Sequence, residues 1–192
     1  MIIYLYNRAP QHIYCIYIFY FLQLTLLAKH ESESPHTSYA EIAEAIATHG
    51  AAATIKQDQA ELFKRMIFNI LVNNNDDHLR NHGFILDANP KIKGWRLSSL
   101  YDVVPVPTTA TERFLHLAVG HQGRLATLPN ALSQHGVFGL SKVQAMQAVE
   151  HISAIVREWK NQFEAAGVSS KDIDRISSAF RRPRELGLAQ LE

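Results

Sequence analysis

The chain has 192 residues, of which 47% are hydrophobic and 19% are charged, a balance typical of a folded globular protein rather than a disordered one. This length suits one domain with a substantial buried core. The net charge of +1 at pH 7 predicts no general attraction to nucleic acid or to a membrane surface. The single cysteine, Cys15, excludes a disulfide framework and a multi-cysteine zinc site, and it suits a cytoplasmic protein.

The N-terminal segment, residues 1–23, has an unusual composition. It holds five of the seven tyrosines, and the run from Ile13 to Leu27 is interrupted only by Gln23 and Thr25. A membrane-spanning helix needs about 20 apolar residues, and a signal peptide needs flanking basic and small residues. We therefore expect no membrane segment, and the β-branched and aromatic content favours a strand. A small protein anchored to a membrane through this run is the alternative.

Two helices are predicted next. After "HESESPHTS", which we interpret as a polar linker, Ser38 and Glu41 match a Ser-x-x-Glu capping box. This helix is predicted to end at His49–Gly50. The apolar face of the second helix comprises Ala60, Phe63, Ile67, Ile70 and Leu71. This helix ends at an asparagine run, because Asn tolerates left-handed backbone dihedrals.

The second half of the chain predicts a hairpin and further helices. Two short strands flank an Asp-Ala-Asn-Pro turn, and "RFLHLAV" is a candidate strand or a short buried helix. A long helix is predicted from Ser141 to Ala166, ended by Gly167, with an inward stripe of Val143, Met146, Val149, Ile152, Val156, Trp159 and Phe163. Another helix starts at Ser169 or Ser170, with Ile173, Ile176 and Phe180 inward. The predicted fold class is mainly α with one small hairpin.

The stretch "NNNDDHLRNH", residues 73–82, concentrates polar side chains between two apolar elements. Asp76 and Asn81 can converge if this loop curls back, and Asp102 follows the second predicted strand. Phosphoryl transfer needs a carboxylate that accepts the proton of the acceptor hydroxyl, together with amide and carboxylate oxygens that hold Mg²⁺. The spacing fits these needs. It also fits a polar loop whose Asx turns cap neighbouring elements.

A zinc-hydrolase site is a further alternative. His78 and His82 are four residues apart, with Asp76 and Asp77 beside them, and this histidine spacing binds zinc on a helix. The asparagines around them disfavour a continuous helix, which counts against this interpretation.

The combination of "FNILVNNNDDHLRNHGFIL" with "WRLSSLYDVVPV" resembles the C-terminal lobe of HipA-like toxins, which are serine/threonine-protein kinases of bacterial toxin–antitoxin systems. The resemblance covers residues 24–182 and leaves 183–192 as a C-terminal tail. It implies a helical, protein-kinase-like lobe with the hairpin at the catalytic loop. It also implies that Asp76 is the catalytic base and that Asn81 and Asp102 bind Mg²⁺ and thereby ATP. Asp77 and His78 would shape the loop.

The chain departs from this family at its N-terminal side. No Gly-rich run occurs in the first sixty residues, and Lys29, the only lysine before Lys56, lacks the strand context of a phosphate-pairing lysine. Because positioning and electrostatics supply almost all catalysis in phosphoryl transfer, we expect a truncated lobe that is inactive, or nearly so, on its own.

The resemblance also implies partners, namely a protein substrate and an antitoxin-like helix-turn-helix protein. We expect no direct binding of nucleic acid. The alternative function is a non-catalytic interaction module that retains the helical scaffold in order to bind an antitoxin-like partner.

Overall fold

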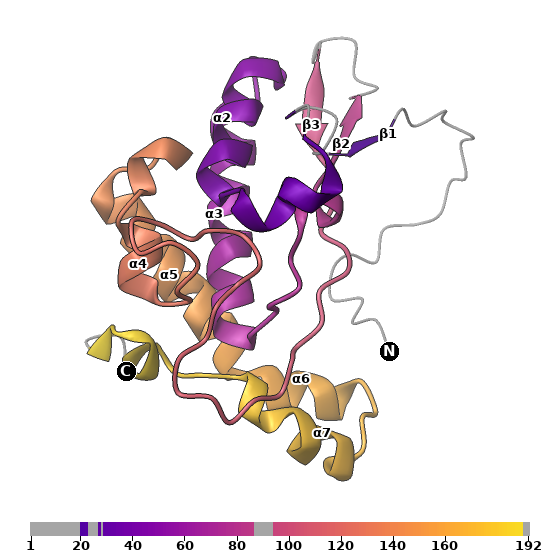
Figure 1. Cartoon of the computed structure of the whole chain (residues 1–192). Helices are drawn as coiled ribbons and strands as arrows, with labels where there is room; N and C mark the ends of the chain where they lie inside the picture. The colour runs from indigo at the N-terminus through magenta and orange to yellow at the C-terminus, as the bar shows by residue number, and fades with distance from the viewer. Residues whose placement is uncertain (1–19, 23–26, 28, 87–93, 190–192) are drawn as a thin grey trace.

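The computed structural model describes residues 20–22, 27, 29–86 and 94–189 (Figure 1). The predicted Asp-Ala-Asn-Pro turn and most of the apolar run from Ile13 to Leu27 lie outside these residues. Within the run, Tyr20–Leu22 form strand β1, so the strand expectation is confirmed for these three residues. None of the helices in the described part of the chain combines the length and the apolar character needed to cross a membrane.

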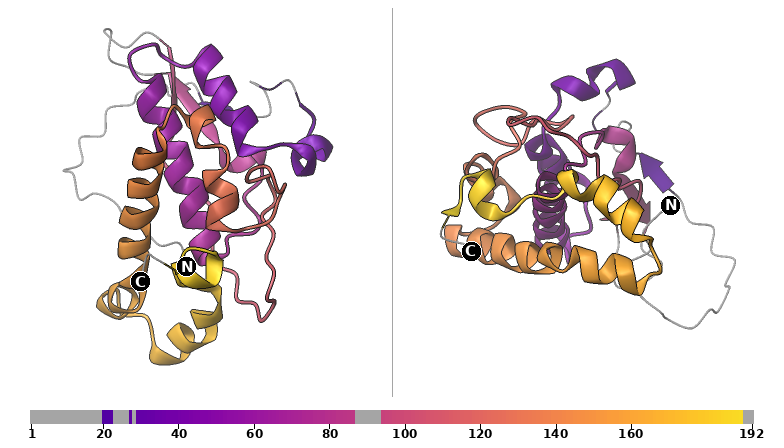
Figure 2. Two further views of the ribbon diagram at one scale, coloured as in Figure 1. Left: turned by 90° about the vertical axis from the view of Figure 1, so that its left-hand side faces the viewer. Right: turned by 90° about the horizontal axis from the view of Figure 1, so that it is seen from below.

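Helix α3 (Ile55–Val72) lies at the centre of the molecule and packs against α2 (Tyr39–His49) and α5 (Lys142–Arg157) (Figures 1 and 2). The predicted capping box at the start of α2 is present, since the Ser38 side chain accepts from the Glu41 backbone N–H. α3 ends where predicted, with Asn73 in the left-handed region at a φ of 52°. The mainly helical expectation is confirmed.

A small antiparallel sheet in the order β1-β2-β3 lies beside these helices. It contains the predicted hairpin, made of β2 (Gly83–Leu86) and β3 (Trp95–Leu97), with Phe84 opposite Leu97. Both of these side chains are buried in the core. The hairpin is tied to α3 by Asp58, whose carboxylate accepts hydrogen bonds from the Leu97 N–H (3.2 Å) and the Arg96 guanidinium (2.9 Å).

The long helix predicted over 141–166 is two helices, α5 and α6 (Trp159–Ala165). The two helices are separated at Glu158, and the Trp159 ring at the start of α6 stacks on Phe180, with centroids 3.9 Å apart and planes 1° apart. The predicted stripe was wrong at Val143, which is 67% exposed. The small residues Ala145 and Ala148 are buried instead. Gly167 follows α6 at a φ of 80°, as predicted.

Two further expectations were wrong. The "RFLHLAV" segment is neither strand nor helix but irregular chain with bends at His116 and Leu117 and isolated bridges, Phe114 to Leu125 and Ser38 to Ala118. The "HESESPHTS" stretch is not a simple linker, because it contains the 3₁₀ helix η1 (Glu31–His36). Ser34 in η1 is buried and accepts a 3.1 Å hydrogen bond from the Leu79 N–H, which fixes η1 against the polar loop.

Short elements complete the fold: η2 (Leu79–Asn81), α4 (Leu128–Leu132), η3 (His135–Phe138), α7 (Ser170–Ile176), η4 (Ser177–Ala179) and η5 (Pro183–Leu186). Ser169 caps α7 as predicted, and Ile173 is buried. Leu186 and Leu188, in the segment that we set aside as a tail, are buried in the main core.

Candidate functional site

The polar loop of residues 73–82 begins where α3 ends. Asn73 accepts a hydrogen bond on its carbonyl from the Val106 N–H (3.3 Å), and its Nδ2 donates to the Val106 carbonyl (2.6 Å). Asn74 donates from Nδ2 to Oδ1 of Asn69 on α3 (3.1 Å). The asparagine run therefore ends the helix and also joins the loop to the segment that follows Asp102.

Asp77 is the buried centre of the loop, with only 2% of its surface exposed. Its Oδ2 accepts hydrogen bonds from the Tyr39 hydroxyl on α2, from Asn69 Nδ2 (2.8 Å) and from His82 Nε2 (3.1 Å). Since a carboxylate can only accept, the His82 proton toward Asp77 is on Nε2. Two helices and His82 of the loop itself thus hold one carboxylate, which agrees with the expectation that Asp77 shapes the loop.

The electrostatics of this cluster keep Asp77 ionised. Burial by itself raises the pKa of Asp77, but the charge of His82, its hydrogen bond and that of Tyr39 outweigh burial and lower this pKa below its ordinary value. Burial, followed by the negative charge of Asp77, raises the pKa of Tyr39 well above its ordinary value. Tyr39 therefore stays a neutral donor to an anionic Asp77.

Asp76 and Asn81 are joined directly. Asn81 Nδ2 donates a 3.0 Å hydrogen bond to the backbone carbonyl of Asp76, and this carbonyl also accepts from the His78 N–H (3.0 Å). The Asp76 side chain is exposed, whereas Asn81 is 4% exposed. Because the amide nitrogen of Asn81 is used inside the loop, its oxygen is the atom left to accept a hydrogen bond or a cation.

Asp102 lies beyond β3 and is exposed. Its φ of 55° is uncommon for a residue other than glycine. The preceding residue, Tyr101, donates from its hydroxyl to the Arg80 carbonyl (2.6 Å), which links this segment to the residue before Asn81. In the described part of the chain, no hydrogen bond or ion pair joins Asp102 directly to Asp76 or Asn81.

The zinc alternative gains no support. Among the described residues, no three His, Cys, Asp or Glu side chains gather in a metal-binding cluster. His82 is buried against Asp77, and His78 meets His116 edge to face, with ring centroids 5.9 Å apart. The two histidines thus have different partners.

Sequence reasoning missed the residues that support the loop from outside it. Asn69 is fully buried on the apolar face of α3, and a polar residue at such a position signals a required hydrogen bond. Tyr39 is also fully buried and reaches Asp77 from α2. Ser34 and His116 meet at 3.1 Å beside Leu79; in the sequence these residues are far apart and carry no shared pattern.

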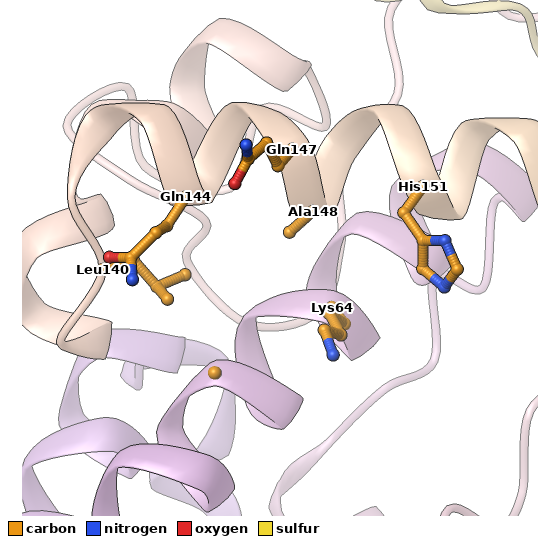
Figure 3. A pocket seen from close by; sticks show the side chains of 7 residues that line it. Lys64, Leu140, Gln144, Gln147, Ala148 and His151 are labelled. Atoms are coloured by element: carbon orange, nitrogen blue, oxygen red, sulfur yellow. The ribbon is translucent and has the colours of Figure 1, made fainter.

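A cavity of about 260 Å³ lies between α3 and α5 (Figure 3). Figure 3 shows Lys64 on one side of it and Gln144, Gln147 and His151 on the other. None of the residues that line it comes from the polar loop or from the segment of Asp102. We therefore do not assign it to the candidate site.

A family model described as the HipA-like C-terminal domain matches residues 12–163. The chain belongs to the HipA-like C-terminal domain family. The match begins inside the atypical segment 1–23 and contains Asp76, Asn81 and Asp102. A search of curated proteins found no match to this sequence.

The fold is similar to that of a solved chain from the complex of the Shewanella oneidensis MR-1 toxin–antitoxin proteins HipA and HipB with their operator DNA. The TM-score is 0.65 at 14% sequence identity, and the similarity covers 97% of this HipA-like chain. It covers 46% of the solved chain, so the HipA-like chain spans about half the length of that structure.

Proposed function

We propose that this HipA-like chain forms the C-terminal lobe of a serine/threonine-protein kinase, in which the γ-phosphate of ATP passes to a protein hydroxyl. In this proposal Asp76 is the catalytic base, and Asn81 and Asp102 bind Mg²⁺. The observation that carries the proposal is the hydrogen bond from Asn81 Nδ2 to the Asp76 carbonyl. It holds Asn81, the proposed magnesium ligand, against the backbone carbonyl of Asp76, whose side chain is exposed.

The residues present fit a magnesium ion by their chemistry. Mg²⁺ prefers oxygen ligands and is held by one or two carboxylates together with substrate phosphates. Asn81 supplies an amide oxygen, because its nitrogen is committed to Asp76, and Asp102 supplies an exposed carboxylate in an uncommon backbone conformation. Non-glycine residues at positive φ often occur at functional sites. When bound, Mg²⁺ would neutralise charge on the phosphates of ATP.

The remaining residues of the loop have a positioning role in this proposal. Asp77 is anionic, buried and held from α2, α3 and His82, so the peptide that carries Asp76 cannot easily move. Asp76 itself is exposed and would take up the proton of the acceptor hydroxyl. Preorganisation of this kind costs no reorganisation when the reaction occurs.

We propose that the 192 residues alone have little activity. A positioned base contributes about 10²–10⁴-fold, which is a small part of the acceleration that enzymes achieve. The sequence has no Gly-rich run before Asp76 that resembles a nucleotide-covering loop. A lobe that supplies such a clamp would be required for efficient turnover.

The solved neighbour comes from a complex with HipB and operator DNA, and this supports an antitoxin-like helix-turn-helix protein as a partner of our chain. The net charge of +1 favours contact with the partner rather than with DNA. If the partner binds and nucleotide does not, the non-catalytic interaction module becomes the better description.

Isothermal calorimetry with ATP, with and without Mg²⁺, tests the kinase site. We expect Mg²⁺-dependent binding by the native chain, loss of that binding in Asp102→Asn, and retention in Asp76→Asn. Glu150→Gln, an exposed position on α5, is the matched control. Identical binding by the native chain and Asp102→Asn would overturn the proposal. Transfer of labelled phosphate to a protein, measured with and without an added N-terminal lobe, then tests turnover.

A further inference from the structure

We propose that a second cavity, of about 120 Å³, between η1 and the polar loop binds a phosphate-type oxyanion. Its polar lining residues are Ser32, Ser34, His78, Arg80 and His116. Three of these side chains can carry a positive charge and two carry hydroxyl groups. No Asp or Glu lines the cavity. The inference is separate from the kinase proposal, since none of the five is proposed there as the catalytic base or as a magnesium ligand.

Hydrogen bonding at the wall of this cavity is incomplete. Among the described residues, Nδ1 of His78 is buried and has no hydrogen-bond partner. Buried polar atoms are nearly always paired, so an unpaired one calls for an explanation such as a missing ion. The His78 ring stands edge-on to His116, with an interplanar angle of 85°. A ligand with several acceptor oxygens would satisfy Nδ1 of His78 in the tautomer that carries the ring proton on this nitrogen.

Ser34 fixes the opposite side of the cavity. Its Oγ accepts from the Leu79 N–H (3.1 Å) and lies 3.1 Å from His116 Nε2. Since Oγ already accepts one hydrogen bond, its proton is available to His116. The pocket is therefore built from three separate segments of the chain that are held together by direct hydrogen bonds, as expected of a preformed site.

The charges around the cavity favour an anion. Burial, followed by the positive charges of His78 and Arg124, lowers the pKa of His116, although Asp76 and Asp77 act in the opposite direction. Arg80 Nη2 lies 3.5 Å from His78 Nε2. Asp77 is hydrogen-bonded to His82, so part of its charge is already compensated. A dianion in the cavity would be attracted to the guanidinium of Arg80, and the imidazoles of His78 and His116 would serve as hydrogen-bonding groups at its oxygens.

The size of the cavity restricts the ligand. A water molecule takes about 30 Å³ of liquid volume, so the space suits a single tetrahedral oxyanion and excludes an adenine nucleotide. The chemistry is that of a phosphate monoester or free phosphate. Because His78 is two residues after Asp76, a phosphorylated serine or threonine bound here would lie beside the proposed acceptor site.

NMR of the His116 imidazole at fixed pH tests this inference in EDTA, with no ATP or Mg²⁺. The probes are inorganic phosphate, O-phosphoserine and serine at matched ionic strength. We expect a saturable shift with phosphate or O-phosphoserine and none with serine. If O-phosphoserine binds more tightly than inorganic phosphate, the ligand of the cavity is a phosphorylated side chain. If inorganic phosphate binds more tightly, the ligand is the free ion. Loss of a charge-assisted hydrogen bond in Arg80→Ala weakens the affinity by about tenfold or more.

Two variants distinguish a specific loss of phosphate binding from misfolding. His116→Gln keeps a hydrogen-bonding group next to Ser34, and we expect calorimetry to show weaker phosphate binding by this variant. Arg175→Ala, at an exposed site on α7, should bind phosphate as the native chain does. The inference is overturned if no probe saturates, or if both cavity variants bind phosphate as the native chain does. Because nucleotide is absent, this failure would leave the roles proposed for Asp76, Asn81 and Asp102 untouched.

Discussion

The hydroxyl of Tyr101 donates a 2.6 Å hydrogen bond to the backbone carbonyl of Arg80. These residues immediately precede Asp102 and Asn81, which are the two proposed magnesium ligands. Arg65 of α3 supports the same segment, since its guanidinium donates to the Ser98 carbonyl (2.6 Å). The relative position of Asn81 and Asp102 is thus set by contacts of their neighbours.

Tyr101→Phe removes this hydrogen bond and keeps the ring. A typical hydrogen bond contributes about 0.5–1.5 kcal/mol, so we expect Mg²⁺-dependent ATP affinity to fall about two- to tenfold. Calorimetry in magnesium measures the change. Binding measured in EDTA should be equal in the two proteins, and an unchanged Kd in magnesium would show that Tyr101 does not position Asp102.

Asp77→Ala and Asp76→Ala should differ strongly in stability although the residues are adjacent. Removal of the Asp77 carboxylate leaves Tyr39, Asn69 and His82 buried without their acceptor, and breaking such a buried pair costs about 3–5 kcal/mol. Asp76→Ala keeps the backbone carbonyl that Asn81 binds, so we expect a change within about 0.5 kcal/mol. Urea denaturation measures both. Equal losses would contradict the assignment of Asp77 as the anchor.

Stability at acid pH depends on the same carboxylate. Because the folded pKa of Asp77 is lowered, its stabilisation is complete above the unfolded value, about 3.9, and is lost as pH falls through the folded value. The difference in unfolding free energy between the native chain and Asp77→Asn should therefore shrink below about pH 4. A difference that stays constant down to pH 2 would contradict the ionised state of Asp77.

Ser34→Ala tests the contact between η1 and the loop. It leaves the Leu79 N–H buried without an acceptor, at a cost of about 1–3 kcal/mol. Ser32→Ala, two residues away and exposed, should change the unfolding free energy by at most about 0.5 kcal/mol. Thermal unfolding of Ser34→Ala and Ser32→Ala measures the two effects. Similar melting temperatures for the two variants would show that η1 does not hold the loop.

Local signals in the sequence were enough to predict much of the helical frame. The capping box at Ser38 and the asparagine stop at Asn73 use only neighbouring residues, and both were found in the structure. The break at Glu158 could not be predicted, because no Gly or Pro marks it. Beside it Trp159 stacks on Phe180, a contact between residues distant in the chain that no local pattern reveals.

The candidate site was likewise predictable only in part. The polar run predicted a loop, and the resemblance to the family singled out Asp76, Asn81 and Asp102, whose roles stay predictions. The supporting residues Tyr39 and Asn69 were hidden, because each lies on an apolar helix face and acts through a long-range bond to Asp77. Their burial became visible only in the folded chain.

Paramagnetic broadening by Mn²⁺ tests the central claim most directly, since Mn²⁺ takes the same oxygen ligands as Mg²⁺ and broadens only nearby resonances. With ATP present and Mn²⁺ substoichiometric, we predict broadening of both the Asn81 side-chain amide and the Asp102 backbone amide. The Gly187 amide, beside Pro129 of α4, should stay sharp. If the signals of Asn81 and Asp102 stay as sharp as that of Gly187, these residues do not share a metal site and the kinase-lobe account is contradicted.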